Sequence, residues 1–173
     1  MLVPVVDHAD GLAILLTERA ADLRNHPGQI AFPGGRVEAG ESPVDAALRE
    51  TEEEIGLGRA HVEVLGYLPD HLVISGFRVT PVVAFVRPGA LLRLDPVEVA
   101  ATFEVPLAYV LDPGNHRSRM RPLGDGHVEV FDIPFGKRNI WGATAGMLMT
   151  LCALLGDAPV EGGADSATPA PRT

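Results

Sequence analysis

The chain has 173 residues, of which 46% are hydrophobic and 21% charged, and 14 basic against 23 acidic residues give a formal net charge of −9. This length suits about one domain with a substantial core, and the acidic balance argues against a nucleic-acid partner, whose phosphates require a basic face. The single cysteine, Cys152, excludes an intrachain disulfide framework and a cysteine-rich zinc site. No signal-peptide pattern follows Met1, and the apolar run 140–156 is too short and too rich in Gly and Thr to span a bilayer. We therefore expect a cytoplasmic protein with no membrane partner.

Two short apolar segments open the chain. Residues 2–6 and 12–16, separated by an Asp-Gly turn, predict two β-strands. The polar, glycine-bearing stretch 17–35 predicts a long ordered loop. Loops of this length in compact domains usually carry function, so we expect binding residues here.

A helix is predicted over residues 43–55. Ser42 suits the N-cap, Pro43 the first helical position and Asp45 the first turn, where a negative charge is favourable. Gly56 is a natural stop just beyond the last helical residue.

The second half of the chain predicts more strands and one further helix. The strand-like segments are residues 62–68, 79–86, 103–111 and 128–135. Residues 140–155 predict an apolar helix, and the Ala, Gly, Pro and Ser composition of 157–173 predicts a disordered tail. The expected fold class is α/β, with a mixed β-sheet between helices in one domain, residues 1–156.

The helix 43–55 carries four glutamates within five positions. At about 100° per residue, Glu50, Glu53 and Glu54 share roughly a third of the circumference, and Arg49 can orient Glu53 from one turn earlier. Ala46 and Ala47 lie on the same face and would leave room for a bulky ligand. The opposite stripe, expected to pack on the sheet, is Val44, Leu48, Thr51 and Ile55. The carboxylates form either a site for a hard divalent cation or a solvated charged face.

The spacing around this helix resembles the Nudix box of the Nudix hydrolases. The matching positions are Gly35, Glu41, Arg49, Glu50, Glu53, Glu54 and Gly56, in that spacing. One departure is Thr51, where the family usually carries an aliphatic residue.

The resemblance implies an α/β/α sandwich and hydrolysis of a diphosphate joined to another group. It implies Mg²⁺ or Mn²⁺ as cofactor, held by Glu50, Glu53 and Glu54 with the Gly35 carbonyl. Glu41 and Arg49 would support these ligands. Glu50 is the first candidate for the general base; Glu98, on a loop outside the box, is the second, with an exposed loop acid as the alternative interpretation.

The flanking segments are similar to the coenzyme A pyrophosphatase subfamily. The similar positions are 15–19, Arg24, His26, Gly28, Gln29, 32–35, 98–107 and 140–145. One departure is Ala20, where Ser is usual. The resemblance implies coenzyme A or a derivative as substrate, with 3′-phosphoadenosine 5′-phosphate and 4′-phosphopantetheine as products.

Four side chains of the loop 17–35 are candidates for substrate binding. Arg19 and Arg24 can bind the additional phosphate of coenzyme A, or pair with Glu18 or Asp22 on the surface. His26 and Gln29 either bind substrate or order the loop. Gly34, which lacks a side chain, lets the backbone approach a ligand closely.

Two other functions remain open at this stage. The first keeps the chemistry but acts on nucleoside polyphosphates or nucleotide sugars such as ADP-ribose. The second is a ligand sensor without catalysis, which the three retained box glutamates disfavour. The expected partner is a small-molecule diphosphate, and the sequence leaves open whether the chain forms a homodimer.

Overall fold

The computed structural model describes residues 1–23, 26–73, 76–124 and 126–156, so the predicted tail 157–173 lies outside the described residues. Its centre is a six-stranded mixed sheet in the order β3-β2-β1-β7-β4, with β8 paired to β2. The strands are β1 (Leu2–His8), β2 (Gly11–Arg19), β3 (Ile30–Ala31), β4 (Val62–Tyr67), β7 (Val82–Val86) and β8 (Val99–Pro106). β1 runs parallel to β7 and antiparallel to β2.

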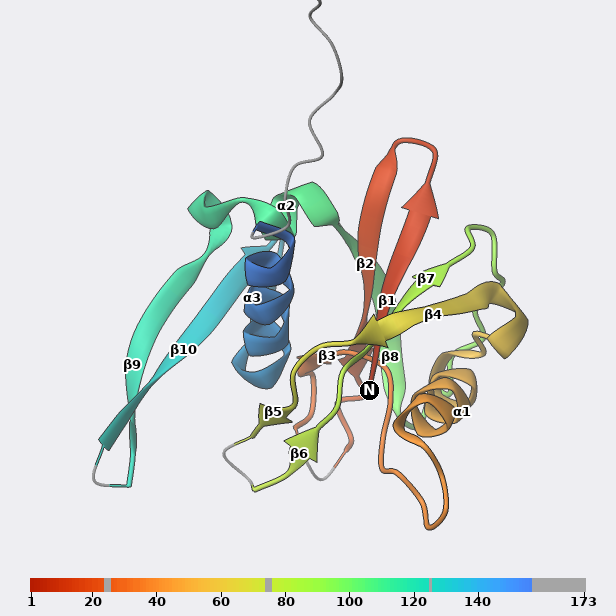
Figure 1. Cartoon of the computed structure of the whole chain (residues 1–173), viewed down its shortest axis with the longest axis horizontal. Helices are drawn as coiled ribbons and strands as arrows, with labels where there is room; N and C mark the ends of the chain where they lie inside the picture. Colours follow the sequence, from red (N-terminus) through yellow and green to blue (C-terminus); the bar gives the residue numbers. More distant parts are fainter. Residues whose placement is uncertain (24–25, 74–75, 125, 157–173) are drawn as a thin grey trace, which may run out of the picture.

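Two helices lie on opposite sides of this sheet, α1 (Pro43–Ile55) on one and α3 (Gly142–Gly156) on the other (Figure 1). The side chains of the central strands alternate between the two sides, as strand geometry requires. The core under α3 contains Val3, Val5, Ile14 and Leu16, and the core under α1 contains Leu2, Val6 and Leu15. The predicted mixed sheet between helices is therefore confirmed.

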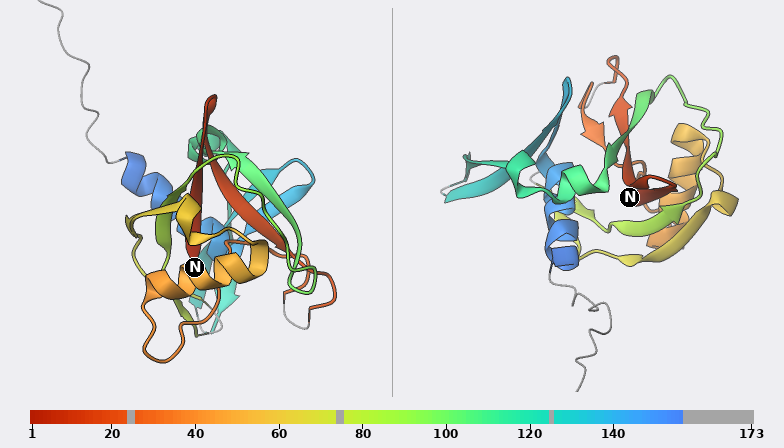
Figure 2. Two further views of the ribbon diagram at one scale, coloured as in Figure 1. Left: turned by 90° about the vertical axis from the view of Figure 1, so that its right-hand side faces the viewer. Right: turned by 90° about the horizontal axis from the view of Figure 1, so that it is seen from above.

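A second, smaller part of the fold projects from the body as a long hairpin, seen from two further sides in Figure 2. It is an antiparallel sheet of β9 (Arg117–Leu123), β10 (Gly126–Phe135) and β11 (Arg138–Trp141). A separate two-stranded ribbon joins β5 (His71–Leu72) to β6 (Arg78–Val79). The remaining short helices are α2 (Leu107–Leu111), η1 (Arg59–His61) and η2 (Pro113–Asn115).

The helix α1 begins and ends at the predicted residues. Ser42 accepts a hydrogen bond from the Asp45 amide at 3.1 Å, and Gly56 adopts a left-handed conformation with φ of 70°. Both caps satisfy backbone groups that a helix leaves unpaired at its ends.

Prolines and glycines explain three predictions that were wrong at element boundaries. The segment 103–111 is not one strand, because β8 ends at Pro106, which has no N–H for a further ladder bond, and α2 follows. The segment 79–86 is divided at Pro81 into β6 and β7. The last helix begins at Gly142, with φ of 65°, so residues 140 and 141 belong to β11.

The stretch 17–35 is more regular than the predicted loop. β2 extends to Arg19, and the two residues of β3 pair with it, Ala31 opposite Thr17 and Ile30 opposite Glu18. This pairing returns the chain to the sheet immediately before residues 32–35. In the described part of the chain, no helix is both long and apolar enough to cross a bilayer.

Candidate active site

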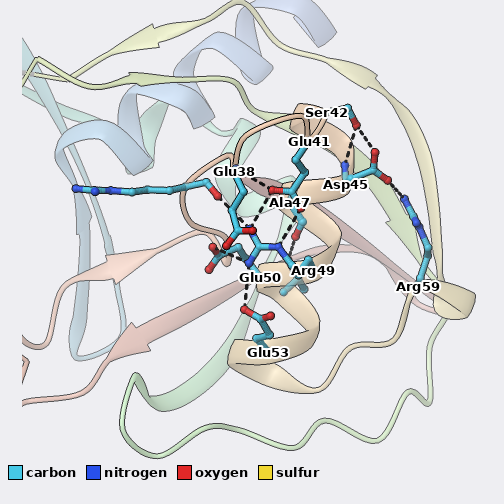
Figure 3. A network of polar contacts seen from close by, with 11 residues as sticks. Glu38, Glu41, Ser42, Asp45, Ala47, Arg49, Glu50, Glu53 and Arg59 are labelled. Carbon is cyan, nitrogen blue, oxygen red and sulfur yellow. Dashed lines mark hydrogen bonds and ion pairs between the residues drawn. The ribbon is translucent and has the colours of Figure 1, made fainter.

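Arg49 is the centre of the polar network on α1 (Figure 3). Its guanidinium holds both carboxylate oxygens of Glu41, with Nε to Oε1 at 2.9 Å and Nη2 to Oε2 at 3.0 Å. Nη1 donates to Oε1 of Glu50 at 3.0 Å and to Oε2 of Glu53 at 3.2 Å. One arginine therefore orients three carboxylates, and the predicted contact between Arg49 and Glu53 is present.

Glu41 ties this network to the loop before the helix. The Glu38 amide donates to its Oε2 at 3.0 Å, and Nη2 of Arg49 also donates to the Arg36 carbonyl at 3.1 Å. The hydrogen bond from Arg49, together with that from the Glu38 amide, lowers the pKa of Glu41, while the same contact raises the pKa of Arg49. Both groups stay charged at neutral pH and fix the loop against the helix.

Glu54 is the buried carboxylate of the site, with 6% of its surface exposed. Its Oε2 accepts a hydrogen bond from the Gly34 amide at 2.9 Å. Burial raises its pKa to about 7; the charges of Glu98 and Glu50 act in the same direction, whereas the Gly34 amide and the Arg19 charge oppose it. Without a cation, this carboxyl is about half protonated at neutral pH, so a nearby positive charge would be strongly favourable.

Gly35 lies directly against the carboxylate of Glu50. A Cβ placed on Gly35 would stand 2.3 Å from Cδ and Oε2 of Glu50 and 2.5 Å from its Oε1. The backbone and the carboxylate can approach each other this closely only because the residue is glycine. The backbone of Gly35 therefore lies beside the Glu50 carboxylate, and the role of its carbonyl as a metal ligand stays a prediction.

The three box glutamates differ in exposure. The side chain of Glu53 is 61% exposed and that of Glu50 is 20% exposed, whereas Glu54 is buried. The expectation that Ala46 and Ala47 leave room for a ligand is wrong, since each is only 1% exposed. The buried side of α1 is wider than the stripe predicted from helical spacing, because residues on one flank of that stripe, Ala46, Ala47 and Glu54, are also covered.

Thr51 fits this buried side. It is fully buried, and its hydroxyl donates to the Ala47 carbonyl one turn earlier at 2.6 Å. The hydroxyl is therefore satisfied within the helix, and the departure from the usual aliphatic residue is accommodated.

The donor set fits a hard divalent cation. Glu50, Glu53 and Glu54 offer carboxylate oxygens, the ligands that Mg²⁺ and Mn²⁺ prefer, and the Gly35 backbone lies next to Glu50. Among the residues that the structure describes, no group of three or more His, Cys, Asp or Glu side chains is arranged so that it could hold a metal ion.

Two predicted residues outside the box are brought to Glu54. Arg19 and Glu98 both shift its pKa through their charges, in opposite directions. The loop of Glu98 is joined to β2 by the hydrogen bond from the Ala20 amide to the Glu98 carbonyl, 2.9 Å long. The alternative surface pair between Arg19 and Glu18 is not formed, because Glu18 pairs with Arg138 at 3.0 Å.

The other loop candidates are less closely connected to the carboxylates. His26 is exposed and has a positive φ of 55°. The side-chain Nε2 of Gln29 lies near the start of α3, 4.0 Å from the position that a Cβ on Gly142 would take. Arg24 lies outside the described residues.

The sequence analysis missed two residues at the edge of the site. Arg36 follows Gly35, and its guanidinium lies over the ring of Phe77, 5.3 Å from the ring centroid. The position of Arg36 inside the box was a usable signal. No signal in the sequence indicated Phe77, since this residue is 41 positions from Arg36 in the chain and contacts it only because of how the ribbon of β5 and β6 folds.

Comparisons with known proteins agree with this fold and site. The NUDIX domain family model matches residues 1–123. The chain is 40% identical over 165 residues to NudL of Escherichia coli K12, an uncharacterized Nudix hydrolase, covering 92% of this chain and 83% of that protein. This chain therefore belongs to the Nudix hydrolase family, whose members hydrolyse pyrophosphate bonds and generally use divalent metal ions.

Solved structures show the same fold at low sequence identity. The Mycobacterium smegmatis Nudix hydrolase RenU matches with a TM-score of 0.62 and 20% identity, covering 94% of this chain and 87% of that one. The Caenorhabditis elegans Ap4A hydrolase matches with a TM-score of 0.54 and 22% identity, covering 62% and 78%. The predicted family and fold are confirmed.

Proposed function

We propose that this chain hydrolyses the diphosphate of coenzyme A or a derivative, yielding 3′-phosphoadenosine 5′-phosphate and 4′-phosphopantetheine. The observation that carries the proposal is the place of Arg19. The charge of Arg19 acts on Glu54 and opposes the rise that burial causes in the pKa of that carboxyl. The neighbouring Glu18 forms its ion pair with Arg138 and not with Arg19. In this proposal Arg19, which Glu18 does not neutralise, binds an anionic group of the substrate such as the additional phosphate of coenzyme A.

The carboxylates have separate tasks in this proposal. Glu50, Glu53 and Glu54 hold Mg²⁺ or Mn²⁺ with the Gly35 carbonyl, while Glu41 and Arg49 keep Glu50 and Glu53 oriented. Gly34 fixes Glu54 through its amide. The bound cation supplies charge neutralisation at the phosphate oxygens and acidifies a water molecule. Positioning of the diphosphate then accounts for most of the remaining rate enhancement.

Two residues remain candidates for the general base. Glu50 is the first, because Arg49 holds its Oε1 and its carboxylate lies against the Gly35 backbone. Glu98 is the second, because it is exposed and its charge acts on Glu54. Under saturating metal, substitution of the base by Gln should lower kcat and remove the acidic limb of the pH profile of kcat. If the substituted residue is instead a metal ligand, a higher metal concentration should recover part of the lost activity.

Arg24, His26 and Gln29 enter the proposal as additional substrate contacts on the loop before β3. A single domain over 1–156, a disordered tail, a cytoplasmic location and a homodimer also remain predictions.

The decisive experiment is mass spectrometry of the products formed from coenzyme A with Mg²⁺ or Mn²⁺ in ¹⁸O-labelled water. The two named products are expected, and the position of the label identifies the phosphorus that is attacked. ADP-ribose and a dinucleoside polyphosphate serve as competing substrates. Faster cleavage of either than of coenzyme A would overturn the choice of substrate but not the hydrolase.

Arg19→Ala tests the role of the arginine directly. The substitution should weaken the binding of coenzyme A by about 1–3 kcal/mol more than the binding of its 3′-dephosphorylated analogue, since a charge-assisted contact is lost. Equal effects on KM for the two substrates would contradict the assignment of Arg19 to the additional phosphate.

A further inference from the structure

Phe77 is an exposed aromatic ring in contact with Arg36, the residue that follows Gly35 in the chain. It leaves 54% of its surface exposed, although a ring of this size gains much from burial. The Arg36 guanidinium lies over the ring with Cζ 5.3 Å from its centroid, within the range of a cation–π contact. The contact leaves much of the ring available to a ligand.

Arg36 links this ring to the carboxylates of α1. It directly follows Gly35, which lies against Glu50, and its carbonyl accepts a hydrogen bond from Arg49. Within the described residues, the guanidinium of Arg36 has no carboxylate partner, although the chain is acidic overall. Its N–H groups are therefore available to phosphate or sugar oxygens between the site and the ring.

The ribbon of β5 and β6 holds Phe77 in place. The Val73 amide donates to the Phe77 carbonyl at 2.9 Å, and the next residues pair, Leu72 opposite Arg78. In β5 of the same ribbon, the His71 ring packs against Gly146 of α3. A Cβ on residue 146 would be 2.6 Å from Cε1 of His71. The backbone of Phe77 is thus hydrogen-bonded to a ribbon that packs against α3.

We propose that Phe77 and Arg36 form a stacking platform for the purine base of the substrate. The diphosphate lies at the carboxylates, the Arg36 guanidinium contacts oxygens next to it, and the base stacks on the exposed ring of Phe77. An aromatic ring suits this task because every base presents a flat π-face. The inference rests on the proposed function in one respect: it requires a substrate whose purine is close to its diphosphate. Coenzyme A, ADP-ribose and adenine dinucleotides all have this feature.

The test compares Phe77→Ala and Phe77→Trp in the full chain. The first variant should raise KM for the adenine-containing substrate roughly 5- to 150-fold, the range for loss of one base–aromatic stack, with little change in kcat. The second should retain the wild-type KM. Leu72→Ala, which removes an apolar side chain 75% exposed on the same ribbon, is the matched control and should leave KM unchanged.

A substrate without a base separates stacking from a merely structural role. In this analogue, a methyl group replaces the 3′-phosphoadenosine of coenzyme A while the diphosphate and the pantetheine remain, and Phe77→Ala should not change its KM. An equal rise in KM for both substrates would overturn the proposal. If ADP-ribose is cleaved and coenzyme A is not, the choice of substrate has failed, and the same comparison on ADP-ribose still decides the platform.

Binding without catalysis provides an independent readout. With a chelator present, adenosine 3′,5′-bisphosphate should quench the fluorescence of the Phe77→Trp variant beyond any quenching of Trp141, the single tryptophan of the natural chain. No additional quenching at concentrations that saturate the protein would overturn the proposal.

Discussion

Gly35→Ala tests how closely the backbone must approach the metal-binding carboxylates. The new Cβ would stand 2.3 Å from Oε2 of Glu50, about 1 Å closer than the 3.4 Å at which ordinary contact begins. Glu50 must therefore move by about 1 Å, which also strains its 3.0 Å contact with Arg49. A displacement of this size in a catalytic group can cost about 100-fold in rate.

The fold should survive this change. Gly35 is exposed and its φ lies outside the left-handed region, and the Glu50 side chain can rotate away. We expect kcat to fall about 100-fold with a weaker apparent affinity for Mg²⁺, measured by product release during metal titration. Gly58→Ala is the matched control, because φ is −66° and the nearest atom to a new Cβ is 3.8 Å away. Wild-type kcat in Gly35→Ala, or an equal loss in Gly58→Ala, would refute this reasoning.

Three further predictions concern Glu54 and the contact between His71 and Gly146. Glu54→Gln should lower turnover by at least about 100-fold, measured at the Mg²⁺ concentration that saturates the natural enzyme, because a charged metal ligand is lost, and additional Mg²⁺ should recover part of the activity; near-normal turnover at that concentration would exclude Glu54 as a ligand. Folding raises the pKa of Glu54 from 4.5 to about 7, so the native state retains a proton that the unfolded chain releases. Without metal, the free energy of unfolding should therefore decrease, by an amount on the order of 3 kcal/mol, as pH rises from 4.5 to 7. Urea unfolding with a chelator checks this, and Glu54→Gln should lack the decrease. Gly146→Ala should destabilise the protein by about 1–3 kcal/mol, because its Cβ would be 2.6 Å from His71. Calorimetry should show a lower Tm that His71→Ala restores in the double variant, and an unchanged Tm in Gly146→Ala would contradict the packing.

The helix α1 was predictable because its signals are local. Ser42, Pro43 and Gly56 define its ends through backbone geometry that depends on neighbouring residues alone. The regular spacing of Arg49, Glu50 and the following glutamates likewise places them on one side of any helix that forms. Family and chemistry followed from this spacing, and the comparisons confirmed both.

Elements that depend on distant partners were predicted less well. β3 is only two residues long and exists because β2 offers a free edge at Thr17 and Glu18. β9 and β11 were missed, since each is held by β10 through pairing that no local pattern reveals. Ala46 and Ala47 were placed on the ligand side because helical spacing alone does not show how much of a helix the rest of the chain covers.

By itself, the sequence determined the carboxylate helix and the glycine pair before it, because helix caps and helical periodicity act over a few residues. The class of reaction followed from the resemblance of this segment to the Nudix box. Only the tertiary structure decided that Glu54 is the buried carboxylate, that Arg19 and Glu98 act on it, and that Phe77 stands beside Arg36. These relations join residues tens of positions apart, and they depend on sheet pairing and core packing, which fix distance and burial and hence the energy of each charge.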